Sequence, residues 1–252
     1  IYMQVIKRDG SKQKISFDKI SQRIGYLIEG VEYGKIFGKQ LNIDSIEIAK
    51  DVCSQVKNNI TTSQLDEYAA EVAAYKVSIH PDYDTLATRI IISNNHKNSK
   101  EYSKFSVMMN LINDKNKTIS EDFIRLVNEY KEILDPIVDE SHILDYKYLT
   151  YFGFKTLEKS YLTKVGSICE RPQHLFMRVA LDLNRYNINN IIECYRYLSN
   201  FYFTHATPTL FNAGNKFNQY SSCYLIGIDD SVEGMYSTLE KCAQISKWAG
   251  GI

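Results

Sequence analysis

The chain has 252 residues, and its 30 basic side chains (Lys and Arg) balance its 30 acidic ones (Asp and Glu). A formal net charge of zero gives no electrostatic argument for binding to nucleic acid or to an anionic membrane surface. No apolar run reaches the roughly 18 residues that a membrane-spanning helix needs, and the N-terminus lacks the pattern of a signal peptide. The hydrophobic content of 44% is typical of a globular protein of one or two domains.

The cysteines are scattered, odd in number and never arranged as CxxC. They are Cys53, Cys169, Cys194, Cys223 and Cys242. This pattern predicts a reducing, cytoplasmic setting and argues against a structural zinc site.

The first part of the chain predicts a β-hairpin followed by four helices. Two short strands flank Asp9-Gly10, the strongest local signal for a tight hairpin turn. Asp18 is expected to cap a helix, and further helices are expected to open at Asp44, at the capping-box pattern Thr61–Gln64, and after the break at His80–Asp82. Apolar residues recur at helical spacing in each of them, which predicts a compact module over residues 1–95.

Four cations, Lys7, Arg8, Lys12 and Lys14, surround this hairpin. Backbone N–H groups in a turn together with Lys and Arg side chains can hold a triphosphate. On charge alone a solvated basic hairpin is the commoner arrangement, so both interpretations stay open at this point.

A polar stretch rich in Lys and Asn, residues 95–118, is interpreted as a linker. A capped helix is expected from Ser120 and is predicted to end at Asp135-Pro136, because proline removes a helical hydrogen bond. Another helix is expected after Arg171–His174, and His174 is assigned to packing or capping because it has no second metal ligand four residues on. A further helix is predicted over residues 189–201.

The last fifty residues predict one β-α step of an α/β sheet or barrel. Thr207-Pro208 interrupts the preceding helix, and Asn212–Gly214 is typical of a turn. Ser221–Ile228 is a short apolar run between turn signals, which favours a buried strand. Asp229–Ser231 then predicts an acidic helix start, and the helix is followed by Gly250-Gly251. Because the chain starts at Ile1 ahead of Met3 and stops within this pattern, we expect it to be a piece of a longer protein.

Four groups of segments, in order along the chain, resemble one family. They are Val5–Gly10 with Phe17–Ile20; His80–Tyr83 with Ser93–Lys97; Tyr151–Tyr161 with Glu170–His174; and Phe203–Gly214, Ser221–Cys223, Asp230–Gly234 and Ile245–Gly251. Together they resemble the large (catalytic) subunit of class I ribonucleotide reductase, of the eukaryotic and large-DNA-virus type. The resemblance implies a mainly α (α+β) fold. It comprises an ATP-cone regulatory domain (1–95), a helical domain (96–218) and the start of the catalytic α/β barrel (219–252) with its first strand and helix.

The resemblance also implies an allosteric activity site in the ATP-cone, where ATP activates and dATP inhibits. The matching positions are Lys7, Arg8, Gln13, Lys14, Ile15, Ser16, Phe17, Asp18, Lys19, Thr62, Asp66 and Lys97. Cations suit phosphates, and Asp66 suits an adenine amino group as its hydrogen-bond acceptor. Gln13 departs from the family, in which an acid is common.

Two further sites are implied in the last segment. A specificity site for dNTP effectors matches Asp230, Ser231, Val232 and Lys247, although the loop before Asp230 is one residue shorter than in animal enzymes. The substrate site matches Thr207, where Ser is commoner, with Ser222 and Cys223. Cys223 matches a redox-active thiol that forms a disulfide in each turnover, because removal of the 2′-hydroxyl as water consumes two electrons. Its partner thiol is expected beyond Ile252, and Cys242 is expected to be a packing residue.

For the whole protein, the resemblance implies reduction of ribonucleoside diphosphates to 2′-deoxyribonucleoside diphosphates by thiyl-radical chemistry, for DNA synthesis. The reductant would be thioredoxin or glutaredoxin, and no metal is implied in this subunit because a separate small subunit carries the metal-radical cofactor. A homodimer and larger dATP-induced oligomers are implied as well. Because the radical cysteine would follow Ile252, the chain by itself is expected to be inactive.

Three alternatives compete with this interpretation. An ATP-cone can serve as a non-catalytic nucleotide sensor, but such repressors carry a zinc ribbon with paired CxxC motifs that this sequence lacks. The anaerobic glycyl-radical reductases also carry a cone, but they resemble Tyr151–Tyr161 and Phe203–Gly214 less well. A plain helical scaffold explains none of the ordered motifs.

Overall fold

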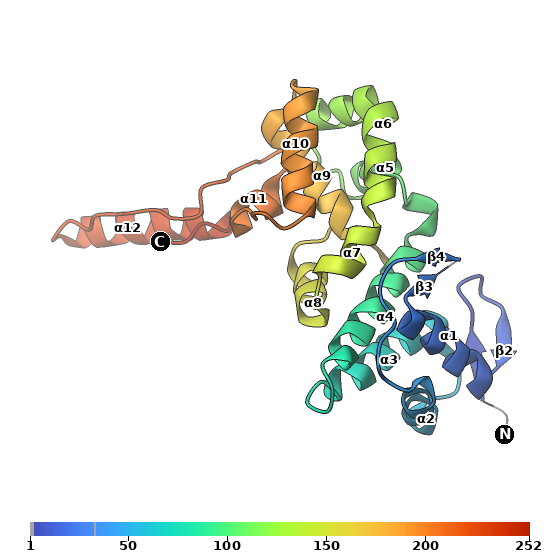
Figure 1. Cartoon of the computed structure of the whole chain (residues 1–252). Helices are drawn as coiled ribbons and strands as arrows, with labels where there is room; N and C mark the ends of the chain where they lie inside the picture. Colours follow the sequence, from blue (N-terminus) through green and yellow to red (C-terminus); the bar gives the residue numbers. More distant parts are fainter. Residues whose placement is uncertain (1–2, 33) are drawn as a thin grey trace. The chain divides into compact units, whose positions relative to one another are not determined.

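The computed structural model describes residues 3–32 and 34–252. They form two compact units, Ile1–Ser103 with Glu140–Pro172 and Lys104–Asp139 with Gln173–Ile252. Helices dominate both units (Figure 1), which confirms the predicted mainly α fold class. The predicted domain boundaries after residues 95 and 218 remain predictions. No helix in the described ranges is both long enough and apolar enough to cross a membrane.

The first unit starts with a small sheet in the order β2-β1-β5, formed by β1 (Gln4–Ile6), β2 (Lys12–Lys14) and β5 (Ile60–Thr61). β1 runs antiparallel to β2, with Val5 opposite Gln13, and parallel to β5, with Val5 opposite Ile60. In the turn, the Gly10 N–H donates to the Lys7 carbonyl at 2.9 Å and Gly10 has a φ of +81°, which glycine adopts without strain. The predicted hairpin at Asp9-Gly10 is confirmed.

Four helices pack beside this sheet: α1 (Phe17–Glu29), α2 (Ser45–Gln55), α3 (Thr62–Tyr75) and α4 (Asp82–Asn98). The predicted caps hold for α2, which Asp44 caps, and for α3, where Thr61 and Gln64 form a capping box. The predicted Asp18 cap of α1 is wrong. The Ser16 side chain accepts the Lys19 N–H, so Asp18 already lies in the first turn.

Arg89 of α4 ties the end of α1 to the loop that follows. Its guanidinium is buried and donates to the carbonyls of Leu27 at 2.7 Å, Ile28 at 3.1 Å and Lys39 at 2.7 Å. The same loop contains the short pair β3 (Val31–Glu32) and β4 (Lys35–Ile36). One buried side chain therefore adds a charged donor to the Leu27 and Ile28 carbonyls, which also accept backbone N–H groups from Gly30 and Leu41.

The rest of the first unit comprises η1 (Lys100–Tyr102), α7 (Ile143–Tyr148), α8 (Tyr151–Ser160) and the hairpin of β6 (Lys164–Val165) and β7 (Ile168–Cys169). Arg171 follows this hairpin and donates to the Ser99 hydroxyl at 2.8 Å and the His96 carbonyl at 3.0 Å. These contacts join residues 140–172 to the end of α4, so the segment belongs to the same unit as the hairpin module.

The second unit is built on α5 (Phe105–Asn116), α6 (Glu121–Ser141), α9 (Pro172–Asn184) and α10 (Ile188–Ser199), with the first turn of α9 and the end of α6 at its boundaries. Its core contains the fully buried side chains of Phe105, Phe123 and Tyr195. α10 confirms the helix predicted over residues 189–201. His174 is fully buried 6.4 Å from the Phe105 ring, in agreement with its predicted packing role.

Two predictions in this region are wrong. The predicted linker over residues 95–118 contains the last turn of α4, η1 and the whole of α5, because Phe105, Met108, Met109 and Ile112 are spaced for one buried helix face. The predicted helix end at Asp135-Pro136 is absent, and α6 continues to Ser141. Leu134 and Val138 are fully buried on either side of the proline, so packing outweighs the lost hydrogen bond.

The remaining elements of the second unit are α11 (Thr207–Asn212) and α12 (Val232–Lys247), drawn in red in Figure 1. The buried strand predicted over Ser221–Ile228 does not form. Leu225 and Ile228 are exposed, and the described residues offer this segment only an isolated bridge between Cys223 and Gly251. A strand needs neighbouring strands to satisfy its backbone, and one bridge does not provide them. The predicted helix start after Asp230 is confirmed, with Ser231 as the cap of α12.

Candidate functional site

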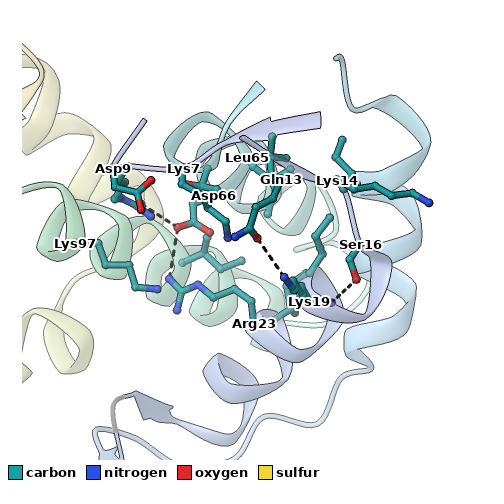
Figure 2. A pocket seen from close by; sticks show the side chains of 18 residues that line it. Lys7, Asp9, Gln13, Lys14, Ser16, Lys19, Arg23, Leu65, Asp66 and Lys97 are labelled. Atoms are coloured by element: carbon teal, nitrogen blue, oxygen red, sulfur yellow. Dashed lines mark hydrogen bonds and ion pairs between the residues drawn. The ribbon is translucent and has the colours of Figure 1, made fainter. Parts of the chain in front are cut away.

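A cavity of about 580 Å³ lies between the hairpin and helices α1, α3 and α4 of the first unit (Figure 2). Most of the predicted activity-site positions line it: Lys7, Arg8, Gln13, Lys14, Ile15, Ser16, Lys19, Thr62, Asp66 and Lys97. Phe17 and Asp18 do not line it and are exposed, because both lie in the first turn of α1 on its outer side. The structure therefore brings together residues that are up to ninety positions apart in the sequence.

The hairpin and the start of α1 supply one wall of the cavity. Gln13 of β2 accepts a hydrogen bond from Lys19 Nζ at 3.2 Å, which ties the second strand to α1. Lys14 lines the cavity, but its side chain points away from the other labelled groups in Figure 2. The Ser16 hydroxyl is committed to the helix cap.

Charges of opposite sign alternate along the other wall. Asp66 Oδ2 of α3 lies 3.3 Å from Arg8 Nη2 and 3.6 Å from Arg23 Nη2. Arg8 also donates to the side-chain oxygens of Asn94 at 2.5 Å and Asn98 at 2.7 Å on α4. Figure 2 shows Arg23 and Lys97 pointing toward the same region. The cations are thus fixed by their partners and are not loose surface side chains.

Arg23 also lines the cavity but is not among the residues predicted from the sequence. It lies four residues after Lys19 on α1, and residues at this spacing share one helix face. That spacing is the feature of the sequence that indicates a place for Arg23 beside Lys19. Burial lowers the pKa of Arg23, but the carboxylates of Asp66 and Glu32 outweigh it and leave the pKa raised. Arg23 is therefore a permanent cation of the cavity.

Lys97 differs from the arginines because it can lose its proton near neutral pH. Burial, followed by the nearby Arg23 guanidinium, lowers its pKa to about 8. Its Nζ lies 3.4 Å from Glu32 Oε1. Burial raises the pKa of Glu32, but hydrogen bonding from Ser93 and the charge of Arg23 outweigh it and keep this pKa below its ordinary value. Glu32 is therefore ionised and supports the charge on Lys97.

The cavity combines an apolar part with a charged part. Val5, Ile20, Ile24 and Leu65 line it beside the cations, and a flat ring can pack against such side chains. Lys7, Arg8, Thr62 and Lys97 also line a neighbouring hollow of about 940 Å³. A ligand with an aromatic ring and a chain of anionic groups matches this arrangement.

The predicted substrate-site residues lie in the second unit. Thr207 is the first residue of α11. Ser222 and Cys223 are adjacent, with 3.5 Å between Oγ and Sγ, and Cys223 is exposed. The Gly251 N–H donates to the Ser222 carbonyl at 2.7 Å, which holds this extended segment beside the end of the chain.

The structure does not bring the predicted specificity-site residues together. Asp230, Ser231 and Val232 lie at the start of α12, where the Ser231 hydroxyl accepts the Gly234 N–H at 3.0 Å. Lys247 is the last residue of this 16-residue helix and lies over the Trp248 ring, 5.4 Å from its centroid. At a rise of about 1.5 Å per residue, the start of α12 and Lys247 at its end are roughly 22 Å apart within one chain.

Comparison with known families gives two matches. Residues 3–98 match the ATP cone domain, and residues 147–218 match the all-alpha domain of ribonucleotide reductase. The first match contains the whole cavity described above.

The chain is also similar over nearly its whole length to known large subunits. It is 48% identical to the ribonucleoside-diphosphate reductase large subunit of monkeypox virus, with 99% of this chain and 32% of the relative aligned. It is 45% identical to large chain 2 of the Saccharomyces cerevisiae enzyme (99% and 28%) and 44% identical to the Arabidopsis thaliana large subunit (99% and 30%).

The chain belongs to the ribonucleotide reductase family. Within that family it corresponds to the ATP-cone and the N-terminal region of the large subunit. It spans about a third of the length of the viral relatives that it matches.

Proposed function

We propose that the chain serves in the large subunit of a ribonucleoside-diphosphate reductase and that its cavity is the allosteric activity site for ATP and dATP. The observation that carries the proposal is the cavity itself. It gathers Lys7, Arg8, Arg23 and Lys97 around Asp66 inside the segment that matches the ATP cone.

The two parts of a nucleotide fit the two parts of this cavity. The phosphates are polyanionic and suit the cations, of which Arg8 and Arg23 can donate two parallel hydrogen bonds to phosphate oxygens. The adenine ring suits the apolar side chains of Ile20, Ile24 and Leu65. Asp66 has only acceptor oxygens when ionised, so it favours the adenine 6-amino group over the 6-oxo group of guanine.

The second unit contains the proposed first segment of the catalytic domain. Thr207 and Ser222 would contact the substrate diphosphate and ribose, and Cys223 would be one of the two thiols that are oxidised to a disulfide in each turnover. The exposure of Cys223 supports this role, because a redox thiol has to meet its partner thiol and a reductant such as thioredoxin or glutaredoxin. A separate small subunit would supply the radical.

The proposed specificity site is consistent with a homodimer. Asp230 and Lys247 lie at opposite ends of α12, so two copies of this helix packed antiparallel would place Asp230 of one copy near Lys247 of the other. Val232, Met235, Tyr236 and Leu239 leave an apolar surface of α12 exposed for such packing. A dNTP effector would then lie between subunits.

Calorimetric titration of the chain with ATP, dATP and GTP tests the proposal. We expect saturable binding of the adenine nucleotides and binding of GTP that is at least tenfold weaker. Lys7→Ala combined with Asp66→Ala should abolish binding, and Asp66→Asn alone should narrow the preference for ATP over GTP, because an amide can also donate to an oxo group.

A matched control is Arg125→Ala, which removes an exposed cation of the second unit whose partner, Asp122, is also exposed. Its nucleotide affinity should equal that of the unmodified chain. Absence of binding by the folded chain, or equal binding of ATP and GTP, would contradict the proposal.

A further inference from the structure

Glu32 lies behind the cavity wall, at the end of β3, and does not line the cavity. Its Oε1 accepts a hydrogen bond from Arg23 Nη1 at 2.9 Å and lies 3.4 Å from Lys97 Nζ. The Ser93 hydroxyl donates a hydrogen bond to the same oxygen. Arg23 and Lys97 both line the cavity, so their positions depend on where the carboxylate of Glu32 is held.

The other oxygen of Glu32 is held from outside the cone. Oε2 accepts a hydrogen bond at 2.8 Å from the hydroxyl of Tyr146, a residue of α7 that is 114 positions further along the chain. The segment that matches the ATP cone ends at residue 98. A contact with the carboxylate behind Arg23 and Lys97 therefore comes from a helix outside the segment that matches the ATP cone.

Ring packing fixes the direction of the Tyr146 hydroxyl. The Tyr146 ring is stacked on Phe37, with centroids 4.3 Å apart and an angle of 28° between the planes. It also meets the His96 ring edge-on, at 5.4 Å and 87°. A ring held on two sides presents its hydroxyl in one direction at little further cost in entropy.

We propose that Tyr146 is a positioning residue of the nucleotide site, which acts through Glu32 on Arg23 and Lys97 and thereby couples occupancy of the cavity to α7. The inference rests on the proposed function of the cavity. Burial and the charge of Glu32 raise the pKa of Tyr146 well above its ordinary value, so the phenol remains a donor throughout the neutral range.

Loss of the hydroxyl has a defined consequence for phosphate binding. With the Tyr146 hydroxyl in place, Oε2 of Glu32 accepts its hydrogen bond and Oε1 is the oxygen that faces the cations. Without it, the carboxylate can turn both oxygens toward Arg23 and Lys97, the nearest charged partners. Glu32 then competes more strongly with phosphate oxygens for the same N–H groups, and nucleotide affinity falls. By reciprocity, a bound nucleotide that draws Arg23 and Lys97 forward alters the contact with α7.

Tyr146→Phe tests the inference, because phenylalanine keeps the ring and removes only the hydroxyl. We expect the affinities for ATP and dATP, measured by calorimetry, to fall about three- to tenfold, the factor that corresponds to one net hydrogen bond. Tyr83→Phe is the matched control. It removes a hydroxyl that donates to Glu47 at 3.0 Å, and this carboxylate lies in the same unit but does not line the cavity. The nucleotide affinity of Tyr83→Phe should equal that of the unmodified chain.

A double-mutant cycle separates positioning from a general structural role. If Tyr146 acts through Glu32, Tyr146→Phe should cause no further loss of affinity in a Glu32→Ala background, whereas independent structural effects would add. A second readout is hydrogen exchange of the unmodified chain. ATP should slow exchange of the α7 amides in the unmodified chain and in Tyr83→Phe, and should leave them unchanged in Tyr146→Phe.

The outcomes distinguish this inference from the proposed function. If the unmodified chain binds neither ATP nor dATP, the proposed function fails. If it binds them while Tyr146→Phe binds equally well, or while the losses in the cycle are additive, the function stands and the inference is overturned. Should Tyr146→Phe fold poorly, hydrogen exchange of the unmodified chain decides, because α7 exchange that does not respond to ATP contradicts the coupling.

Discussion

Lys97 Nζ lies 3.4 Å from Glu32 Oε1 and shares the cavity wall with the Arg23 guanidinium. Burial and Arg23 together hold the pKa of Lys97 at about 8, well below its ordinary value. A lysine that titrates so close to neutral pH makes any anion bound beside it sensitive to pH.

We therefore predict that nucleotide affinity decreases as the pH rises from 7 to 9. Bound phosphate stabilises the charged form of Lys97 and raises its pKa, so binding takes up a proton wherever the free chain has lost it. Below pH 7 Lys97 is already charged and this contribution is complete. Above pH 8 the affinity should fall by up to about tenfold per pH unit. Calorimetric dissociation constants from pH 6.5 to 9.5 measure this directly.

Lys97→Arg provides the control for this pH dependence, because an arginine stays protonated throughout this range. The decline above pH 8 should disappear in this variant. Phosphate groups with a second pKa of about 6 do not titrate in the same window. An unchanged decline in Lys97→Arg would show that another group causes it.

Arg89 is expected to be among the largest single contributors to the stability of the first unit. It is buried and donates to three carbonyl groups at the end of α1 and in the following loop. Arg89→Met should lower the free energy of opening of α1 and α4 by about 3 kcal/mol, because these carbonyls lose their charged donor. Native-state hydrogen exchange of amides in both helices measures that free energy.

Arg89→Lys should restore less than half of the loss, because a single ammonium group cannot reach carbonyls on both sides as a planar guanidinium does. Arg125→Met is the matched control. Its exposed ion pair with Asp122 should contribute less than about 0.5 kcal/mol. A loss in Arg89→Met as small as that of the control would contradict the anchoring role.

The features that could be predicted from the sequence are those in which the partners are close along the chain. The Asp9-Gly10 turn, the Asp44 cap and the box of Thr61 with Gln64 each depend on a few consecutive residues. The polar Lys and Asn residues of α5 suggest a linker, whereas the spacing of its buried side chains is that of a helix. The strand predicted over Ser221–Ile228 is absent, because strand formation depends on neighbouring strands, and the local sequence does not specify them.

The same distinction applies to the site. Lys7 and Arg8 were recognised from the hairpin, and Asp66 and Lys97 from the family resemblance. Arg23 and Glu32 contribute through tertiary contacts, and no local pattern marks Glu32 as a partner of two cations. Tyr146 is even harder to predict from the sequence, since its hydrogen bond to Glu32 exists only when α7 packs beside β3.

Pro136 offers a test of how packing outweighs local preference in α6. Proline within a helix costs about 3 kcal/mol relative to alanine, yet α6 continues through this position with Leu134 and Val138 fully buried. Pro136→Ala restores the missing N–H and should raise the free energy of opening of α6 by about 1–3 kcal/mol. Glu132→Ala, at an exposed position of the same helix, should change it by less than about 0.5 kcal/mol. No gain in hydrogen-exchange protection in Pro136→Ala would mean that α6 is shaped around the proline.

Thiol reactivity should rank the cysteines by their environments. Cys223 is exposed, whereas Cys169 is buried, and its burial with nearby Glu158 and Glu170 raises its pKa to about 12. At pH 8 the thiolate fraction of Cys169 is therefore on the order of one in ten thousand, and only the thiolate reacts. We predict that a disulfide reagent modifies Cys223 first and Cys169 last, as followed by absorbance and peptide mass mapping.

Cys223→Ser should remove the fastest phase of that reaction and leave the slow modification of Cys169 unchanged. The unfolded chain serves as the reference, because all five cysteines should then react at similar rates. A fast phase that persists in Cys223→Ser would show that another thiol is the accessible one. It would also remove the support that exposure gives to Cys223 as a redox thiol, because exchange requires an approach to the sulfur atom.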